Sequence, residues 1–254
     1  MISHMYVFNK LKYIAFFSLL PLMAFRMPAR KIKVYLVGDS TMSIKPVSKY
    51  PETGWGMPFA NFFDESVIVD NRAQNGRSTK SFMEEGRWKS VTDSLKAGDY
   101  VFIQFGHNDE AKTKKTYTTE EEFKNNLGIY VKETLNSGAF PILLTPVTRR
   151  SFDADGKVKE THKVYSGIVR TVAKELNVPL IDLDKESMVL IEKYGMENSK
   201  LLFHKLEPGQ NPNYPAGVDD NTHFNEYGAR RIAEVVLLEL KKLNPELVNR
   251  IVKR

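Results

Sequence analysis

The sequence predicts a three-layer α/β/α sandwich built on a five-stranded parallel sheet. Five short runs rich in β-branched and other apolar residues follow one another after residue 30, and segments with helical periodicity separate them. Parallel strands need crossover connections, and right-handed crossovers place helices on both faces of the sheet. The chain of 254 residues is also long enough for one such domain to bury a core without disulfides or a structural metal.

The predicted elements alternate along the chain. The strand candidates cover residues 33–37, 67–70, 100–105, 140–145 and 178–182. The helix candidates cover residues 55–63, 87–95, 119–137, 159–176, 185–194 and 226–242. Asn225 stands directly before the last helix candidate, where its side chain can cap the first turn. The Pro- and Gly-rich stretch 207–222 fits neither pattern and is predicted to be a long loop, and such loops in compact domains are usually functional.

Composition excludes several classes of protein. Hydrophobic residues make up 42% of the chain and charged residues 27%, which is typical of a globular protein and not of a disordered or collagen-like one. The sequence contains no Cys, so disulfides, thiolate zinc sites, iron–sulfur clusters and a cysteine nucleophile are excluded. The net charge of +6 falls to +3 when Lys10, Lys12 and Arg26 of the N-terminal segment are removed. This mild positive charge argues against a nucleic-acid partner and is compatible with an acidic polysaccharide.

Residues 1–29 are predicted to be a signal peptide, which leaves residues 30–254 as a single domain. Two lysines precede the uncharged apolar stretch 13–25, and Ala24 and Ala29 offer small residues for a cleavage site. The apolar stretch is too short to span a bilayer, although an N-terminal amphipathic or membrane-anchoring helix is an alternative. Export of a Cys-free protein predicts a bacterial periplasm or the extracellular medium, with no stable membrane association after cleavage.

Chemistry in an open parallel sheet lies at the carboxyl ends of the strands. Four of the predicted strands are followed there by polar or glycine-rich blocks, and a fifth block closes the predicted loop. These blocks are Gly38-Asp39-Ser40-Thr41, residues 71–78, Gly106-His107-Asn108-Asp109, residues 146–150 and Asp220-Asn221-Thr222-His223. Each block is a weak signal alone, but their meeting at one edge of one sheet predicts a functional site.

Ser40 is the candidate nucleophile of that site. A serine on a strand-to-helix turn exposes its hydroxyl, and the following helix N-terminus favours a developing negative charge. Asp220 and His223 are three residues apart and can lie on one side of a turn, so that the carboxylate holds the imidazole tautomer while the other ring nitrogen faces the serine. Asp219 competes with Asp220 but is one residue out of register with His223. Read singly, Ser40 could instead cap a helix, and the Asp and His could mark a capped helix start with a solvent-facing His.

These blocks resemble, in order and spacing, those of the SGNH (GDSL-type) hydrolases. Residues 37–41, 54–56, 104–109 and 146–150 look more narrowly like the rhamnogalacturonan acetylesterase branch, and the resemblance covers roughly residues 31–240. It implies a flavodoxin-like α/β/α fold, no metal or organic cofactor, and hydrolysis of O-acetyl esters on a pectic polysaccharide.

The resemblance also implies a role for each site residue. Ser40 becomes the nucleophile, His223 the base and Asp220 the residue that orients it. The backbone N–H groups of Ser40 and Gly76 and the side-chain amide of Asn108 become the oxyanion hole. Such donors act on the negative charge of the tetrahedral intermediate, and glycine at position 76 permits close backbone approach.

Arg77, Arg149 and Arg150 follow predicted strands and are candidates for binding the substrate. A guanidinium binds a carboxylate with two hydrogen bonds, which suits the galacturonate units of an acidic pectic backbone. The alternative for the last two arginines is pairing with Asp153 and Asp155. The predicted function is therefore a secreted serine esterase that deacetylates an acidic polysaccharide. A lipid esterase or acyl-thioesterase on the same fold, and a non-catalytic carbohydrate-binding protein, remain alternatives.

The remaining conspicuous residues receive structural interpretations. His107 is predicted to shape the turn that presents Asn108, and His162 and His204 are predicted to be surface or loop residues. Trp55 and Trp88 lie in apolar surroundings, where core packing and stacking on a sugar are both open. Nothing in the sequence sets the oligomeric state.

Overall fold

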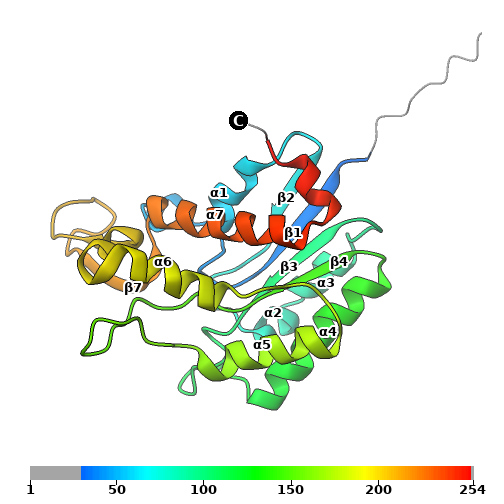
Figure 1. Cartoon of the computed structure of the whole chain (residues 1–254), viewed down its shortest axis with the longest axis horizontal. Coiled ribbons are helices and arrows are strands. Elements are labelled where there is room, and N and C mark those ends of the chain that lie inside the picture. The colour runs from blue at the N-terminus through cyan, green and yellow to red at the C-terminus, as the bar shows by residue number, and fades with distance from the viewer. Residues whose placement is uncertain (1–29, 253–254) are drawn as a thin grey trace, which may run out of the picture. The chain divides into compact units, whose positions relative to one another are not determined.

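A five-stranded parallel sheet forms the centre of the structure, a computed structural model that describes residues 30–252 (Figure 1). Its strands are β1 (Ile32–Gly38), β2 (Val67–Asn71), β3 (Tyr100–Gln104), β4 (Phe140–Leu144) and β5 (Leu180–Ile181). Their order across the sheet is β2-β1-β3-β4-β5, and every neighbouring pair is parallel. The predicted fold class is confirmed, whereas the signal peptide predicted over residues 1–29 lies outside the described residues.

The strand order places the site at the sheet's switch point. The chain runs from β1 outward to β2 and then returns to the other side of β1 to form β3, which is the flavodoxin-like order. In such sheets ligands bind beyond the carboxyl ends of the two strands at which the order reverses. Ser40 follows β1 and Asn108 follows β3, so both residues flank this point.

Alternate residues of each strand face opposite layers. In β1, Val34 and Leu36 belong to one core cluster, while Tyr35 and Val37 belong to the other. All four side chains are fully buried. Burial on both faces is the reason that these strands appear in the sequence as continuous apolar runs instead of alternating ones.

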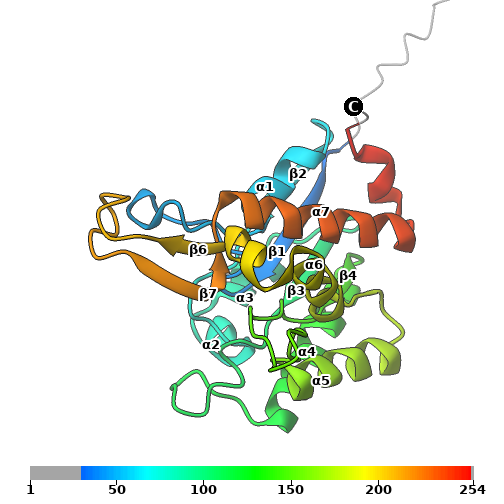
Figure 2. The same ribbon diagram turned by 60° about the vertical axis from the view of Figure 1, so that its left-hand side comes forward.

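Helices supply the two outer layers. The first core cluster includes residues from α1 (Gly56–Phe59), α6 (Leu183–Asn198) and α7 (Glu226–Leu243). The second includes residues from α2 (Thr79–Glu84), α3 (Arg87–Thr92), α4 (Glu120–Asn136) and α5 (Lys163–Glu175). Figures 1 and 2 show α7 on one side of the sheet and α4 with α5 on the other. Short 3₁₀ helices lie at Val47–Lys49, Ala60–Phe62, Ser199–Leu202 and Glu246–Arg250. Within residues 30–252, no helix has both the length and the apolar character needed to cross a membrane.

Helix boundaries agree with the prediction where a cap residue marks them. The Thr119 side chain accepts from the Glu122 N–H at the start of α4, and the Asn225 side chain accepts from the Gly228 N–H at the start of α7. The helix predicted over residues 159–176 begins only at Lys163, because the residues before it pair with the preceding loop: the Lys159 N–H donates to the Ser151 carbonyl, and Thr161 Oγ1 accepts from the Arg149 N–H.

One α-helix of the described residues, α2, was not predicted. In α2, the Ser78 side chain accepts from the Ser81 N–H, and the Ser81 hydroxyl accepts from the Ser78 N–H. This is a capping box in which Ser replaces the usual Glu or Gln at the third helical position, so the usual sequence signature is missing.

The long loop predicted over residues 207–222 is wrong at its C-terminal end. Strands β6 (Phe203–Leu206) and β7 (Val218–Phe224) pair as an antiparallel hairpin, and only the residues between them form the connection. Figure 2 shows this hairpin projecting from the edge of the sandwich. Since β7 has few large apolar residues, its sequence does not resemble a core strand, and pairing with β6 decides its conformation.

Both tryptophans belong to the core. Trp55 is fully buried, and its indole N–H donates to Gln104 Oε1 at 2.6 Å. Trp88 is almost fully buried and donates to Glu133 Oε2 at 2.7 Å. The packing interpretation therefore holds over stacking on a sugar.

Candidate active site

Ser40 lies on a tight turn directly after β1. The Asp39 carbonyl accepts from the N–H groups of Met42 and Ser43, which closes the turn. The fully buried Asp39 carboxyl accepts from the N–H and hydroxyl of Thr41 at 3.0 and 2.9 Å. Burial raises the pKa of this carboxyl, against the opposing effect of the Thr41 hydrogen bonds. The turn holds the Ser40 hydroxyl at the carboxyl edge of the sheet.

The structure brings Ser40, His223 and Asp220 into one hydrogen-bonded chain. His223 Nε2 lies 2.8 Å from Ser40 Oγ, although the two residues are 183 positions apart. His223 Nδ1 lies 2.7 Å from Asp220 Oδ2. An ionised carboxylate can only accept, so Nδ1 carries the ring proton and Nε2 is free to take the serine proton. Neither the helix-cap interpretation of Ser40 nor the solvent-facing interpretation of His223 describes this arrangement.

A bulge in β7 creates the local geometry of the acid and the base. Phe203 pairs with Phe224 and Lys205 pairs with Asp219, so residues 220–223 stand opposite a single residue of β6. Within the bulge, Asp220 Oδ1 accepts from the N–H groups of Thr222 at 2.6 Å and of His223 at 3.0 Å. The pair thus lies on a bulged strand and not on the expected turn of a loop.

Electrostatics keep Asp220 ionised. Burial acts to raise the pKa of its carboxyl, but the hydrogen bond to the His223 ring, the charge on that ring and the two backbone N–H groups outweigh burial and hold the pKa well below its usual range. The competing Asp219 side chain is 83% exposed and pairs with Lys205, outside the chain of hydrogen bonds. The structure therefore selects Asp220 over Asp219 as the partner of His223.

The predicted oxyanion donors lie on three neighbouring loops. Gly76 has φ +76°, a left-handed conformation that favours glycine. Asn108 Nδ2 donates to the Arg77 carbonyl at 3.1 Å, which places the amide beside the Gly76 loop. The hydrogen bonds formed within residues 30–252 leave the N–H groups of Ser40 and Gly76 without a protein acceptor. Both groups are thus free to bind an oxygen of a ligand.

One further contact orients Asn108 and another holds the neighbouring Asp109, and the sequence did not indicate either. Lys114 Nζ donates to Asn108 Oδ1 at 3.1 Å, so the amide presents its nitrogen to the site. The neighbouring Asp109 accepts from the N–H and hydroxyl of Thr79, which ties this loop to the start of α2. Burial raises the pKa of Asp109 to about 7, although the Thr79 hydrogen bonds act in the opposite direction. Lys114 stands in a lysine-rich stretch that is typical of a solvated surface, so no motif marks it.

The three predicted substrate-binding arginines all have intramolecular partners. Arg77 Nε lies 2.9 Å from Glu85, and its Nη1 donates to the Asn75 carbonyl at 2.8 Å. The contacts of Arg150 are with Ser199 Oγ at 2.9 Å, Asn221 Oδ1 at 3.2 Å and the Met196 carbonyl. Arg149 donates to Thr222 Oγ1 at 2.7 Å and lies 3.5 Å from Glu110. The expected alternative partners Asp153 and Asp155 are not among these contacts, and substrate binding by the arginines stays a prediction.

His162 lies in the loop directly before α5, as predicted, whereas the prediction that His204 is a surface or loop residue is wrong. Both side chains are buried, and His204 lies within β6. His162 Nδ1 lies 2.9 Å from the Glu110 carboxylate, and its ring centroid lies 4.3 Å from that of His107. Burial holds the pKa of His107 well below its usual value, and the charge of a neighbouring histidine acts in the same direction. His107 lies next to Asn108 in a packed environment, as a structural role requires.

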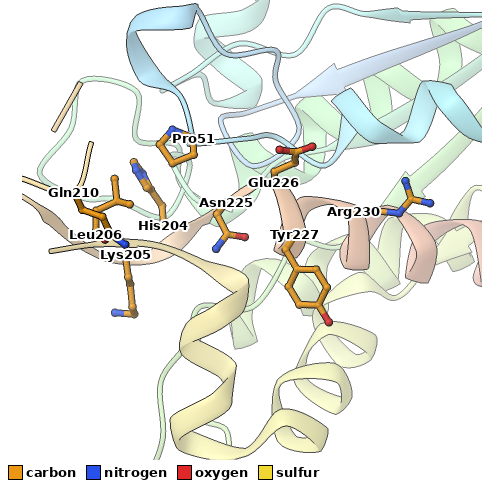
Figure 3. A pocket seen from close by; sticks show the side chains of 9 residues that line it. All are labelled: Pro51, His204, Lys205, Leu206, Gln210, Asn225, Glu226, Tyr227 and Arg230. Carbon is orange, nitrogen blue, oxygen red and sulfur yellow. The ribbon is translucent and has the colours of Figure 1, made fainter. Parts of the chain in front are cut away.

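A pocket of about 570 Å³ lies between the hairpin and the start of α7 (Figure 3). Its lining residues are Pro51, His204, Lys205, Leu206, Gln210, Asn225, Glu226, Tyr227 and Arg230. None of them belongs to the Ser40–His223–Asp220 chain, so the candidate site is defined by its chemistry and not by this pocket. Among residues 30–252, no group of three His, Asp or Glu side chains is arranged to hold a metal ion.

Comparison with known proteins assigns the family. The model of the GDSL-like Lipase/Acylhydrolase family matches residues 36–231. The chain belongs to this family. The match begins in β1, includes Ser40, Gly76, Asn108, Asp220 and His223, and ends within α7.

Curated relatives agree with the narrower resemblance. The chain is 42% identical over 229 residues to the rhamnogalacturonan acetylesterase RhgT of Bacillus subtilis (strain 168), which covers 90% of this chain and 97% of the relative. It is 34% identical over 222 residues to the probable rhamnogalacturonan acetylesterase YesY of the same organism, with 87% and 97% covered. A rhamnogalacturonan acetylesterase of Emericella nidulans is 28% identical, with 80% and 82% covered. The GDSL-type chain is a carboxylic ester hydrolase, as predicted.

Solved structures share the fold. The crystal structure of the Bacillus subtilis protein YxiM matches with a TM-score of 0.73 and 27% identity, over 85% of this chain and 58% of that one. Axe2, an acetylxylan esterase from Geobacillus stearothermophilus, matches with a TM-score of 0.62 at 18% identity, over 89% and 98%. The second likeness concerns the fold alone.

Proposed function

We propose that the protein is a secreted serine esterase that removes O-acetyl groups from an acidic pectic polysaccharide through an acyl-enzyme. The observation that carries the proposal is the chain of two short hydrogen bonds from Ser40 through His223 to Asp220. Beside it lie three hydrogen-bond donors: the N–H groups of Ser40 and Gly76 and the side-chain amide of Asn108. Rhamnogalacturonan acetylesterases among the relatives support the substrate class. The charge and apolar pattern of residues 1–29 supports secretion, to a bacterial periplasm or the medium.

The first half of the reaction forms the acyl-enzyme. Ser40 Oγ attacks the acetyl carbon while its proton passes to His223 Nε2, and the former carbonyl oxygen gains the negative charge. The N–H groups of Ser40 and Gly76 and the Asn108 amide stabilise this oxyanion. Collapse of the intermediate breaks the bond to the sugar oxygen, which takes the proton from Nε2 and leaves.

The second half releases acetate. Water attacks the acetyl group on Ser40, gives one proton to His223 Nε2 and forms a second tetrahedral intermediate. Its collapse returns that proton to Ser40 Oγ and frees acetic acid. Throughout, the Asp220 carboxylate holds the imidazole and stabilises its protonated form.

The contacts of Arg149 support the proposal that the substrate is acidic. Its guanidinium bonds to the hydroxyl of Thr222, the residue between Asn221 and His223, and the side chain stays 35% exposed. The contact to Glu110 is long at 3.5 Å, which leaves N–H donors for a galacturonate carboxylate. Arg77 and Arg150 are held more completely by their own partners, so Arg149 is the arginine proposed to face the substrate.

Acetate release tests the proposal directly. Purified protein and the Ser40→Ala variant are incubated with acetylated rhamnogalacturonan, acetylated xylan and p-nitrophenyl esters of increasing acyl length. The proposal expects fastest acetate release from the pectic substrate, loss of several orders of magnitude in the variant, and acetylated Ser40 trapped by rapid acid quench. A preference for long acyl chains would instead support the lipid esterase alternative. Binding to polysaccharide without acetate release would support the non-catalytic one.

A further inference from the structure

Lys45 is a buried cation beside the nucleophile, and neither a motif nor the mechanism above accounts for it. The residue is only 2% exposed. Its ammonium lies 2.7 Å from Glu52 Oε1, donates to the Ser40 carbonyl at 2.6 Å and donates to Asn75 Oδ1 at 2.8 Å. An ammonium has three N–H groups, so every donor of Lys45 has an acceptor.

Stability alone does not explain a lysine at this position. Burial lowers the pKa of Lys45, and the hydrogen bond and charge of Glu52 only partly oppose this effect. Desolvation of two charged groups offsets most of the attraction between them, so a buried ion pair is weak evidence for a stabilising role. An apolar pair of similar size would fill the same space at less electrostatic cost.

Two of the three acceptors belong to the loops that carry the oxyanion donors. The turn at residues 39–43 does not continue as a helix, so the Ser40 carbonyl receives no helical N–H; the Lys45 ammonium and the Ser43 hydroxyl bond to it instead. The Asn75 side chain accepts from the same two groups. Lys45 and Ser43 therefore bridge the Ser40 turn to the residue that precedes Gly76.

The Asn75–Gly76 peptide is held from both ends. Arg77 Nη1 donates to the Asn75 carbonyl, while Lys45 fixes the Asn75 side chain. A peptide is planar, so the orientation of that carbonyl also sets the direction of the Gly76 N–H.

We propose that Lys45 is a positioning residue that locks the Ser40 and Gly76 backbone donors into the spacing an oxyanion requires. The inference rests on the proposed function, because it assigns Lys45 a role in that same site. Preorganised donors act mainly on the charged transition state. Loss of the ammonium should therefore lower kcat by tenfold or more and change KM by less than twofold.

The test compares Glu52→Gln with the double variant Lys45→Met/Glu52→Gln. Removing Lys45 alone would leave the Glu52 carboxylate buried without its cation, whereas the double variant is uncharged and close in volume to the native pair. Melting temperature, kcat and KM on p-nitrophenyl acetate are measured for both. The rate of inactivation by diethyl p-nitrophenyl phosphate is measured too, because its phosphoryl oxygen takes the place of the oxyanion when Ser40 Oγ displaces p-nitrophenolate. Lys124→Met serves as a control, since Lys124 forms a surface pair with Glu175.

The double variant should melt close to Glu52→Gln, with kcat and the inactivation rate each at least tenfold lower. Equal kcat in the two variants would overturn the inference. So would a rise in KM as large as the fall in kcat, or an unchanged inactivation rate. If the double variant does not fold, Asn75→Leu removes both bridge contacts to the Asn75 side chain, from Lys45 and from Ser43, while keeping the Lys45–Glu52 pair. An unchanged kcat in that variant would overturn the inference equally. Wild-type protein without esterase activity would instead refute the proposed function itself.

Discussion

Asp220→Asn would test how the carboxylate sets the proton position on His223. Asp220 Oδ1 accepts from two backbone N–H groups, and Oδ2 faces His223 Nδ1 at 2.7 Å. An asparagine must keep its oxygen toward the two N–H donors, so its NH₂ group faces Nδ1. The ring then carries its proton on Nε2, which can no longer accept the proton of Ser40.

The expected loss follows from this tautomer change. The same substitution in another Ser-His-Asp triad lowers kcat by about 10⁴-fold, or about 5.5 kcal/mol of barrier. We expect a loss of the same order here, with the melting temperature within a few degrees of wild type, because the two backbone hydrogen bonds in the bulge remain. The matched control is Asp219→Asn, whose side chain is exposed and contacts Lys205.

Initial rates on p-nitrophenyl acetate and thermal melts of the three proteins measure the effect. Activity of the Asp220 variant within tenfold of wild type would refute the tautomer argument. An equal or larger loss in the Asp219 variant would refute the pairing read from the structure.

Three further predictions concern neighbouring residues. Asn108→Ala should lower kcat on p-nitrophenyl acetate by roughly 10²–10³ with little change in KM, and a pure KM effect would assign the amide to substrate binding. Arg149→Met should lower kcat/KM at least tenfold more on an acetylated acidic polysaccharide than on p-nitrophenyl acetate. Rising salt should shrink this difference between the two substrates, and equal losses on both would make Arg149 a scaffold residue. The Asp109 pKa of about 7 lies above its unfolded value, so the native state holds the Asp109 proton more tightly than the unfolded state does. The free energy of unfolding should therefore fall, by up to roughly 4 kcal/mol, as pH rises from about 4 to 7. Urea unfolding across this window should show a flatter dependence for Asp109→Asn, and identical slopes would contradict the buried-carboxyl interpretation.

Local sequence was sufficient for most of the scaffold. The five strands are apolar runs bounded by turn residues, and the caps Thr119 and Asn225 mark α4 and α7, because these features depend on the backbone within a few residues. Local sequence failed at β7, because most of this strand lies in the stretch 207–222 that was predicted to be a loop. Its strand conformation comes from pairing with β6.

The residues of the candidate site could be named from local sequence, but their geometry could not. Ser40, Gly76, Asn108, Asp220 and His223 were named from motifs, since each stands in a short block at a strand end or beside a turn. The choice of Asp220 over Asp219 agrees with the structure, but the stated reason, a single turn, does not, because the geometry is a strand bulge.

Tertiary structure alone decided which partners the charged side chains around the candidate site contact. Lys45 reaches Asn75 across 30 positions, Arg149 reaches Thr222 across 73, and His162 is buried against a Glu110 that no local pattern links to it. The sequence by itself determined the layered fold and the residues of the candidate site, because periodicity and motifs record the local backbone. The partners of buried charges depend on which distant segments the folded sheet brings within hydrogen-bonding distance, and no local pattern records that.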